Sequence, residues 1–241
     1  MKSNRPLVIG HRGASGLEPE NTLAAFRRAL ELGADGVECD IHMSRDGQCM
    51  VFHDPTVERT TDGAGAVAEM DLAQLRRLDA GHGERIPTLD ELLELIKGRG
   101  QLFCELKGAG SAAPAAKVVA DHGMADQVLF ICLDLEMLAE VRRRGEQFRI
   151  GGLFGYNHPV DWPAMAALRA EAMLPYYRMV NLAMLDAAHR AAGLADPSIP
   201  RLGGPLAVYP WTVDRLDDMR VMLALGVDAV ITNWPDVLIR R

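Results

Sequence analysis

The sequence has few aromatic residues and no apolar segment long enough to cross a membrane. Phe, Trp and Tyr make up 5% of the 241 residues. The longest uncharged stretches, such as residues 202–213, fall short of a membrane span and contain Gly and Pro. The N-terminal residues 1–6 are polar and lack the apolar run and small-residue cleavage site of a secretory signal. We therefore expect a cytoplasmic protein that is not stably inserted in a membrane.

Cysteine is also scarce, and its spacing does not match the common zinc and redox motifs. The four cysteines include no Cys-x-x-Cys pair, and each stands in an apolar, strand-like run: Cys39, Cys49, Cys104 and Cys132. This pattern indicates buried free thiols in a reducing compartment.

Basic residues are fewer than acidic ones. The chain has 26 Lys and Arg and 33 Asp and Glu, which gives a net charge of −7. A surface of that sign disfavours nucleic acid or an anionic membrane as the main partner. It is compatible with a small anionic substrate, since a metal ion and a few cations can reverse the field within one pocket. The sequence is also compatible with a homo-oligomer.

Short apolar runs alternate with amphipathic segments along the whole chain. The runs that could form buried strands are residues 7–10, 36–43, 50–53, 102–106, 128–132, 150–154, 172–174, 206–211 and 230–232. The clearest helical segments are residues 21–32, 88–97, 112–121, 135–144, 162–170, 181–192 and 214–225. This alternation implies parallel pairing with right-handed crossovers. About eight such units predict an α/β fold, a single (β/α)₈ TIM barrel over residues 1–241.

A doubly wound sheet is the alternative fold. It is disfavoured as a nucleotide-binding fold because neither G-x-G-x-x-G nor G-x-x-x-x-G-K-[ST] is present. Two segments interrupt the pattern. Residues 54–85 form a small, lid-like insertion after the second strand region, with a short helical piece near residues 71–78, and residues 195–204 form a Pro/Gly-rich loop.

Several residues have the pattern of helix caps. Asn21 precedes the first predicted helix, and Thr88 is followed three residues later by Glu91, as in a capping box. Glycines that follow helical runs, where a left-handed residue is favoured, are Gly33, Gly98, Gly145, Gly193 and Gly226.

Polar side chains stand at the ends of the early strands, where a parallel barrel carries its active site. His11 and Arg12 follow the first strand, and a surface His-Arg pair is the alternative for that dipeptide alone. Glu38 and Asp40 are two residues apart, so they share one face of their strand. Two carboxylates on an inward face are costly unless they bind something, and a hard divalent cation is a natural ligand.

The same reasoning applies to two further strand ends. His53 ends an apolar run, and Asp54 or a backbone carbonyl could fix its tautomer. Glu105 and Lys107 share one face of a strand, either as part of a metal and phosphate site or as a buried ion pair. Two His, three carboxylates, one Arg and one Lys on early strands together suit phosphoryl chemistry.

Several motifs occur in order over residues 7–107 and resemble the glycerophosphodiester phosphodiesterases of the cytoplasmic bacterial type. They are His11-Arg12-Gly13-Ala14, Pro19-Glu20-Asn21-Thr22, Glu38-x-Asp40, His53-Asp54, Arg59-Thr60-Thr61-Asp62-Gly63, Ile86-Pro87-Thr88-Leu89 and Glu105-x-Lys107. The resemblance implies a TIM barrel that hydrolyses glycerophosphodiesters to glycerol 3-phosphate and an alcohol, with Mg²⁺ or Ca²⁺, in lipid and glycerol metabolism.

The resemblance also implies roles for individual residues. His11 and His53 are the acid/base pair, and the metal ligands are Glu38, Asp40 and Glu105. The substrate-binding residues are Arg12, Glu20, Lys107 and Trp211. The insertion after His53 corresponds to a small element that covers the pocket.

The second half of the chain matches the family less closely. Residues 129–134 stand where the family usually has Ser-Ser or Ser-Phe, Asp214 replaces a usual Asn, and Asn233 replaces a usual Asp. These changes concern the alcohol side of the substrate. The alternatives are a phosphoinositide- or lysophospholipid-directed phosphodiesterase on the same barrel, and a non-catalytic sugar-phosphate-binding barrel.

Overall fold

Eight parallel strands form a nearly closed barrel in the computed structural model, which describes residues 5–190 and 206–239. Around the barrel the strands follow the order β8-β7-β6-β5-β4-β2-β1-β9. They are β1 (Leu7–Gly10), β2 (Gly36–Met43), β4 (Gln101–Leu106), β5 (Val128–Cys132), β6 (Arg149–Phe154), β7 (Ala172–Pro175), β8 (Ala207–Val208) and β9 (Ala229–Thr232). The last strand pairs with the first along β9 and β1. The predicted (β/α)₈ barrel is confirmed.

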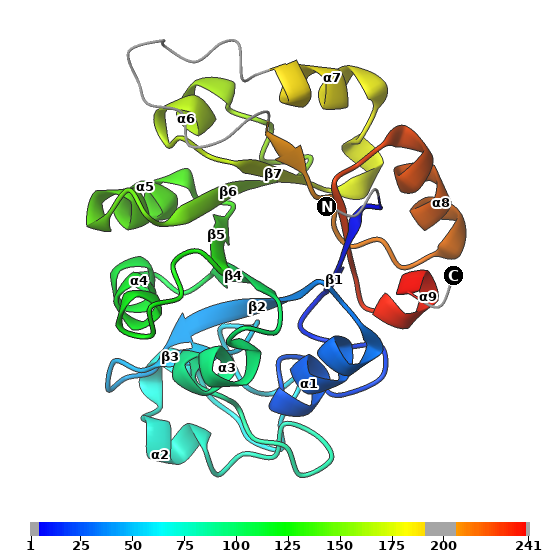
Figure 1. Ribbon diagram of the computed structural model, residues 1–241. Helices are drawn as coiled ribbons and strands as arrows, with labels where there is room; N and C mark the ends of the chain where they lie inside the picture. Colours follow the sequence, from blue (N-terminus) through cyan, green and yellow to red (C-terminus); the bar gives the residue numbers. More distant parts are fainter. Residues whose placement is uncertain (1–4, 191–205, 240–241) are drawn as a thin grey trace.

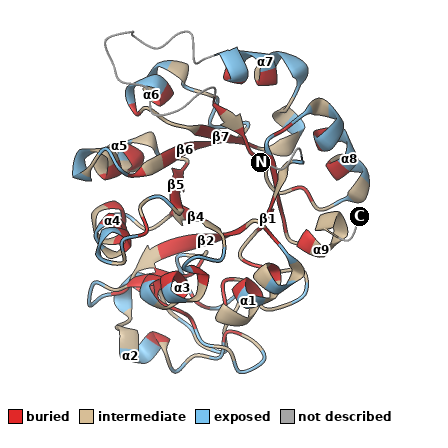
Figure 2. Ribbon diagram, in the orientation of Figure 1, coloured by how far each residue is buried: buried red, intermediate tan, exposed pale blue. Residues whose placement is uncertain are grey.

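Helices surround the barrel on its outside (Figure 1). They are α1 (Leu23–Leu32), α3 (Leu89–Ile96), α4 (Ala112–Asp121), α5 (Leu135–Arg144), α6 (Trp162–Ala167), α7 (Leu182–Arg190), α8 (Leu216–Leu225) and α9 (Pro235–Ile239). Their buried residues face the strands and their exposed residues face outward (Figure 2). The short α9 was not predicted, because five residues are too few for a helical period to be visible. None of the helices in the described ranges is long and apolar enough to cross a membrane.

The two faces of the strands bury different residues. On β2 the residues Val37, Cys39 and Ile41 pack with the inner faces of the surrounding helices. A separate apolar cluster fills the barrel interior: Ile9, Phe103, Leu129, Ile131, Leu153, Ala172, Leu174, Tyr209, Ala229 and Ile231. All four cysteines are free and buried, as predicted. Glu38 and Asp40 alternate with the helix-facing residues of β2, so they point into the barrel.

The run predicted as a strand over residues 50–53 does not belong to the barrel. It forms β3 (Cys49–Val51), which pairs antiparallel with β2. The reason is the connection, since a tight turn joins the strands through the Ser44 N to Gln48 O hydrogen bond (2.9 Å). A turn of this length allows only antiparallel pairing, because a parallel crossover needs a dozen residues or more.

The strand predicted over residues 206–211 is regular only at Ala207–Val208. Pro210 has no N–H and donates nothing to β9, which interrupts the ladder there. Backbone hydrogen bonds still join residues 210–213 to β9. They run from Ile231 N to Pro210 O (3.1 Å) and from Val213 N to Ile231 O (2.9 Å). The barrel therefore closes through irregular pairing.

Two predicted caps are wrong and others are confirmed. Asn21 is not the cap of α1, because Thr22 occupies that position and its side chain accepts from Ala25 N. Gly145 has extended rather than left-handed backbone, with φ of 165°. The capping box of Thr88 and Glu91 is present. Left-handed φ values are found at Gly33, Gly98 and Gly226.

The segment between β3 and α3 contains a 3₁₀ turn, η1 (Val67–Glu69), and the one-turn helix α2 (Leu72–Leu75). It has a small apolar cluster of its own that includes Val57, Val67 and Leu75. The predicted loop at residues 195–204 and the predicted cap at position 193 lie outside the described residues.

Candidate active site

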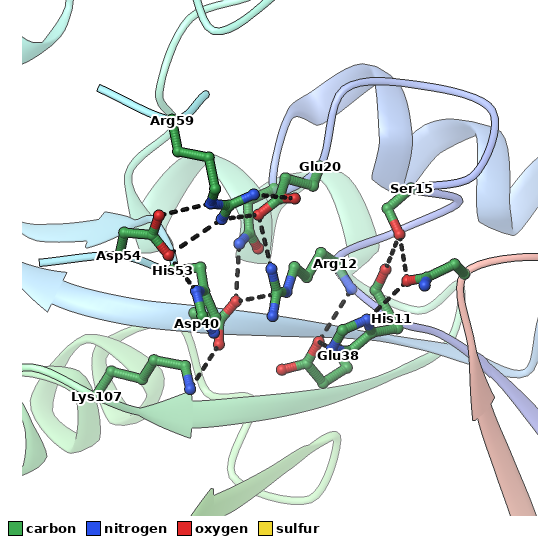
Figure 3. Close-up of polar contacts among 12 residues, drawn as sticks. His11, Arg12, Ser15, Glu20, Glu38, Asp40, His53, Asp54, Arg59 and Lys107 are labelled. Atoms are coloured by element: carbon green, nitrogen blue, oxygen red, sulfur yellow. Dashed lines mark hydrogen bonds and ion pairs between the residues drawn. The ribbon is translucent and has the colours of Figure 1, made fainter. Parts of the chain in front are cut away.

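Figure 3 shows six side chains singled out in the first half of the sequence lying together at one end of the barrel strands: His11, Arg12, Glu38, Asp40, His53 and Lys107. His11 directly follows β1, and Glu38 and Asp40 lie on β2. Glu105 lies on β4, next to β2, where it is the register partner of Asp40. His53 follows β3, so the antiparallel turn of that strand brings it back to the same end of the barrel.

Three carboxylates form a tight cluster, in which Glu38 and Asp40 are buried and Glu105 is half-buried. One oxygen from each of Glu38, Asp40 and Glu105 lies within 4.8 Å of the others. Oxygens Oε1 of Glu38 and Oδ1 of Asp40 are buried without a hydrogen-bond partner. Divalent Mg²⁺ and Ca²⁺ take oxygen ligands at about 2.0–2.6 Å. The spacing and the two oxygens without hydrogen bonds therefore fit a hard divalent cation, and these three residues could hold it.

Burial, together with the crowding of negative charge, shifts the pKa values of two of these groups upward. Burial and the nearby Asp40 raise the pKa of Glu105 to about 7. Burial and Asp40 also raise the pKa of Glu38 well above its ordinary value. Burial alone would raise the pKa of Asp40, but Arg12 and Lys107 lower it. A cation among the three oxygens would relieve the same repulsion.

Arg12 connects the carboxylate cluster to the loop that follows β1. Its backbone N–H donates to Glu38 Oε2 (3.0 Å), Nη1 donates to Glu20 Oε1 (2.8 Å), and Nε lies 3.3 Å from Asp40 Oδ2. This backbone position is left-handed, with φ of 53° at Arg12 and 83° at Gly13. A Cβ at position 13 would lie 2.5 Å from the carbonyl carbon of Ala25, so the turn requires glycine there.

Lys107 forms the predicted ion pair with Glu105, at 2.8 Å, and also lies 3.5 Å from Asp40 Oδ1. The ion pair and the three-carboxylate cluster, which the sequence presented as alternatives, occur together. Asn21 completes the surroundings of Asp40, since its Nδ2 donates to Asp40 Oδ2 (2.9 Å). The sequence indicated Asn21 only as a cap. Its left-handed backbone, with φ of 58°, is instead what turns its side chain toward the site.

His53 is held by a network that reaches the segment between β3 and α3. Its Nδ1 lies 2.5 Å from Asp54 Oδ1, as predicted for the partner of this imidazole. Arg59, from that segment, donates to Asp54 and also makes two hydrogen bonds with Glu20, at 2.9 and 2.7 Å. The network therefore joins the loop after β1, the residues after β3, and the following segment.

His11 is held from the opposite end of the chain. Its Nδ1 lies 2.7 Å from Asn233 Oδ1, and its Nε2 lies 3.9 Å from Glu38 Oε2. Burial, together with the charge of Arg12, lowers the pKa of His11 to about 4, so the imidazole is neutral near pH 7. Asn233 in turn contacts Asp214 and Ser15. The positions 214 and 233, at which the sequence departs from the family pattern, are thus hydrogen-bonded to each other.

No hydrogen bond or ring contact joins Trp211 to these residues in the described part of the chain. Trp211 packs against the apolar cluster inside the barrel and its indole N–H donates to Leu174 O (2.7 Å). Its ring contacts that of Tyr176, at 6.0 Å between centroids. In the strand order β8 stands four strands from β4, across the barrel. The end of the barrel therefore has a charged side with the carboxylates and an apolar, aromatic side with Trp211.

Comparison with known proteins identifies the family to which the chain is similar. The Glycerophosphoryl diester phosphodiesterase family matches residues 11–237. The chain is 34% identical to the glycerophosphodiester phosphodiesterase of Caldanaerobacter subterraneus subsp. tengcongensis, over 98% of this chain and 97% of that protein. It is 46% identical to the probable glycerophosphodiester phosphodiesterase 1 of Mycobacterium tuberculosis, over 97% and 91% of the two chains.

A solved structure extends the comparison to the fold. The Oleispira antarctica phosphodiesterase, solved in complex with the product sn-glycerol-3-phosphate, superposes with a TM-score of 0.84 at 28% identity, covering 96% of this chain and 94% of that one. The match of the family over nearly the whole chain, the curated relatives and the shared barrel agree with one another. The chain belongs to the Glycerophosphoryl diester phosphodiesterase family.

Proposed function

We propose that this chain hydrolyses glycerophosphodiesters to glycerol 3-phosphate and an alcohol, by metal-assisted general acid–base catalysis with His11 and His53. The observation that carries this proposal is the cluster of three carboxylates, two buried and one half-buried, within 4.8 Å of one another, beside Arg12 and Lys107. Family membership supports the reaction class.

Glu38, Asp40 and Glu105 would hold Mg²⁺ or Ca²⁺, which would stabilise negative charge on the phosphate oxygens. Arg12 and Lys107 supply two further positive charges next to the same carboxylates. Guanidinium and ammonium groups in this setting bind phosphate oxygens and orient the diester. Glu20 aligns Arg12 through the 2.8 Å hydrogen bond between them.

The two imidazoles divide the proton transfers. One removes a proton from the attacking hydroxyl or water, and the other gives a proton to the leaving alcohol. Both have one ring nitrogen close to an oxygen acceptor, His11 Nδ1 to Asn233 and His53 Nδ1 to Asp54. Nε2 is therefore the nitrogen of each ring that is available to the substrate.

The apolar side of the barrel end would receive the alcohol. Trp211 is held by Leu174 O, and Leu133 packs against the same interior cluster. The segment of residues 54–85 would cover the site, since its Arg59 binds Glu20 and Asp54. The four free, buried cysteines support a reducing compartment such as the cytoplasm.

The test is release of glycerol 3-phosphate from glycerophosphocholine, glycerophosphoethanolamine and glycerophosphoinositol, each with Mg²⁺, with Ca²⁺ and with EDTA. A lysophospholipid is included as a fourth substrate. We expect release from at least one of the three water-soluble diesters, and its loss in EDTA. No metal-dependent release from any of them would contradict the proposal, and turnover of the lysolipid alone would favour the lipid-directed alternative.

A further inference from the structure

Asn233 occupies a position between a carboxylate and an imidazole that come from different parts of the chain. Its Nδ2 lies 2.7 Å from Asp214 Oδ2, and its Oδ1 lies 2.7 Å from His11 Nδ1. Ser15 Oγ lies 2.6 Å from the same Oδ1 and 2.7 Å from the backbone oxygen of His11. Four side chains thus form one continuous hydrogen-bonded group beside the carboxylate cluster.

Asp214 determines which way the amide of Asn233 points. A carboxylate only accepts hydrogen bonds, so the atom of Asn233 that faces Asp214 is the NH₂ group. The carboxylate itself is held by the backbone N–H of Asn233 (2.9 Å) and lies 3.2 Å from the hydroxyl of Thr232, both to Oδ1. A flipped amide would set two oxygens against each other at this contact.

The direction of the amide then determines the tautomer of His11. The oxygen of Asn233 can only accept, so the ring nitrogen Nδ1 of neutral His11 carries the proton. The lone pair of the ring is consequently on Nε2, which lies 3.9 Å from Glu38 Oε2 and faces the carboxylate cluster. Ser15 has a single hydroxyl proton, and both of its neighbours are acceptors, so it does not compete for the Nδ1 proton.

We propose that Asp214 and Asn233 are positioning residues that hold His11 as its Nδ1–H tautomer, so that Nε2 accepts the proton in the proposed reaction. This inference rests on the proposed function, and it assigns the role of base to His11. Among the described residues, neither Asp214 nor Asn233 forms a hydrogen bond with the three clustered carboxylates. Their effect passes through the imidazole.

The test uses two single variants and their combination. Asp214→Asn lets the amide of Asn233 turn either way, and Asn233→Asp sets two carboxylates against each other. The double variant, Asp214→Asn with Asn233→Asp, again offers one donor and one acceptor in the right order. Asp217→Asn on α8 is the matched control, because Asp217 is exposed and pairs with Arg220 (3.2 Å).

We expect Asp214→Asn to lose on the order of 10²-fold in kcat with little change in KM, within the range that general acid–base catalysis supplies. Asn233→Asp still offers an acceptor to His11 Nδ1, so its loss should be smaller. The double variant should regain most of the loss seen in Asp214→Asn, and Asp217→Asn should match the wild type. A merely structural role predicts loss of folded protein instead, which thermal melts detect. Wild-type kcat in Asp214→Asn, or a double variant no better than Asp214→Asn, would overturn the inference.

The tautomer itself is measured by ¹⁵N NMR at pH 8, where two-bond couplings distinguish Nδ1–H from Nε2–H, and a His11→Ala sample assigns the signal. We expect Nδ1–H in the wild type and a mixture in Asp214→Asn. A wild-type Nε2–H signal refutes the inference, even if the single variants fail to fold. Absence of turnover in the wild type with Nδ1–H present would refute the proposed function alone.

Discussion

Replacing Glu105 with Gln tests the metal site with the least disturbance to the fold. Among the three clustered carboxylates, Asp40 contacts Arg12, Lys107 and Asn21, and Glu38 accepts from the backbone of Arg12. Glu105 is the least buried of the three and accepts a hydrogen bond from Lys107, at 2.8 Å. Gln retains an oxygen that can accept this bond, so the substitution removes charge and keeps shape.

The expected effect on the metal-free protein is small, because two electrostatic contributions oppose each other. With an effective dielectric of about 20, the attraction of Glu105 to Lys107 at 2.8 Å is about 6 kcal/mol, and the repulsion from each charged carboxylate within 4.8 Å is at least about 3.5 kcal/mol. Neutralising Glu105 therefore removes one attraction together with repulsions that offset it, in line with its raised pKa. In EDTA the free energy of unfolding should stay the same or rise slightly.

With metal the two proteins should differ clearly. A cation at about 100 times its Kd stabilises the wild type by about 2.7 kcal/mol. For a chain of this size, that raises Tm by about 5–11 °C. Gln removes one of three anionic ligands, so Glu105→Gln should show little or none of this rise at the same metal concentration.

The assay is a thermal melt of both proteins in EDTA, Mg²⁺ and Ca²⁺. Glu31→Gln serves as the control, since Glu31 is exposed on α1, and it should keep the full metal-induced rise. If Glu105→Gln gains as much stability from metal as the wild type, Glu105 is not a ligand. A large loss of stability in EDTA would show that the pairing with Lys107 outweighs the repulsion.

Three further predictions concern catalysis and stability. His11→Ala and His53→Ala should each lower kcat on the order of 10²–10⁴-fold in the glycerol 3-phosphate assay without lowering Tm, and retained turnover in either would refute its role in acid–base catalysis. Thr88→Ala removes the hydrogen bond to Glu91 N at the start of α3 and should cost about 1 kcal/mol in urea unfolding. Ser111 makes no such bond at α4, so an equal loss in Ser111→Ala would argue against the cap as the cause. Phe130 is fully buried between strand and helices, and Phe130→Ala should cost about 3–5 kcal/mol, whereas a loss below 1 kcal/mol would mean that the core refills the space.

Local patterns in the sequence were sufficient for the architecture of this protein. The alternation of apolar runs and amphipathic segments predicted the barrel. This is possible because the spacing of apolar residues distinguishes a strand from a helix within a few residues. The two-residue spacing of Glu38 and Asp40 placed both side chains inside the barrel for the same reason. The antiparallel β3 was not anticipated, since strand direction depends on the turn between strands rather than on the strand itself.

The tertiary structure decided how the site is connected. His11 and Asn233 are separated by 222 positions in the sequence, and they meet only because β9 pairs with β1 when the barrel closes. The same closure brings Asp214 next to Asn233. The two residues that differ from the family pattern are therefore hydrogen-bonded to each other. Asn21 reaches Asp40 through a left-handed backbone that no local pattern revealed. Residue types and their spacing therefore predicted the fold and the three clustered carboxylates. Which atoms donate and which accept depends on contacts between distant segments, and those exist only in the folded barrel.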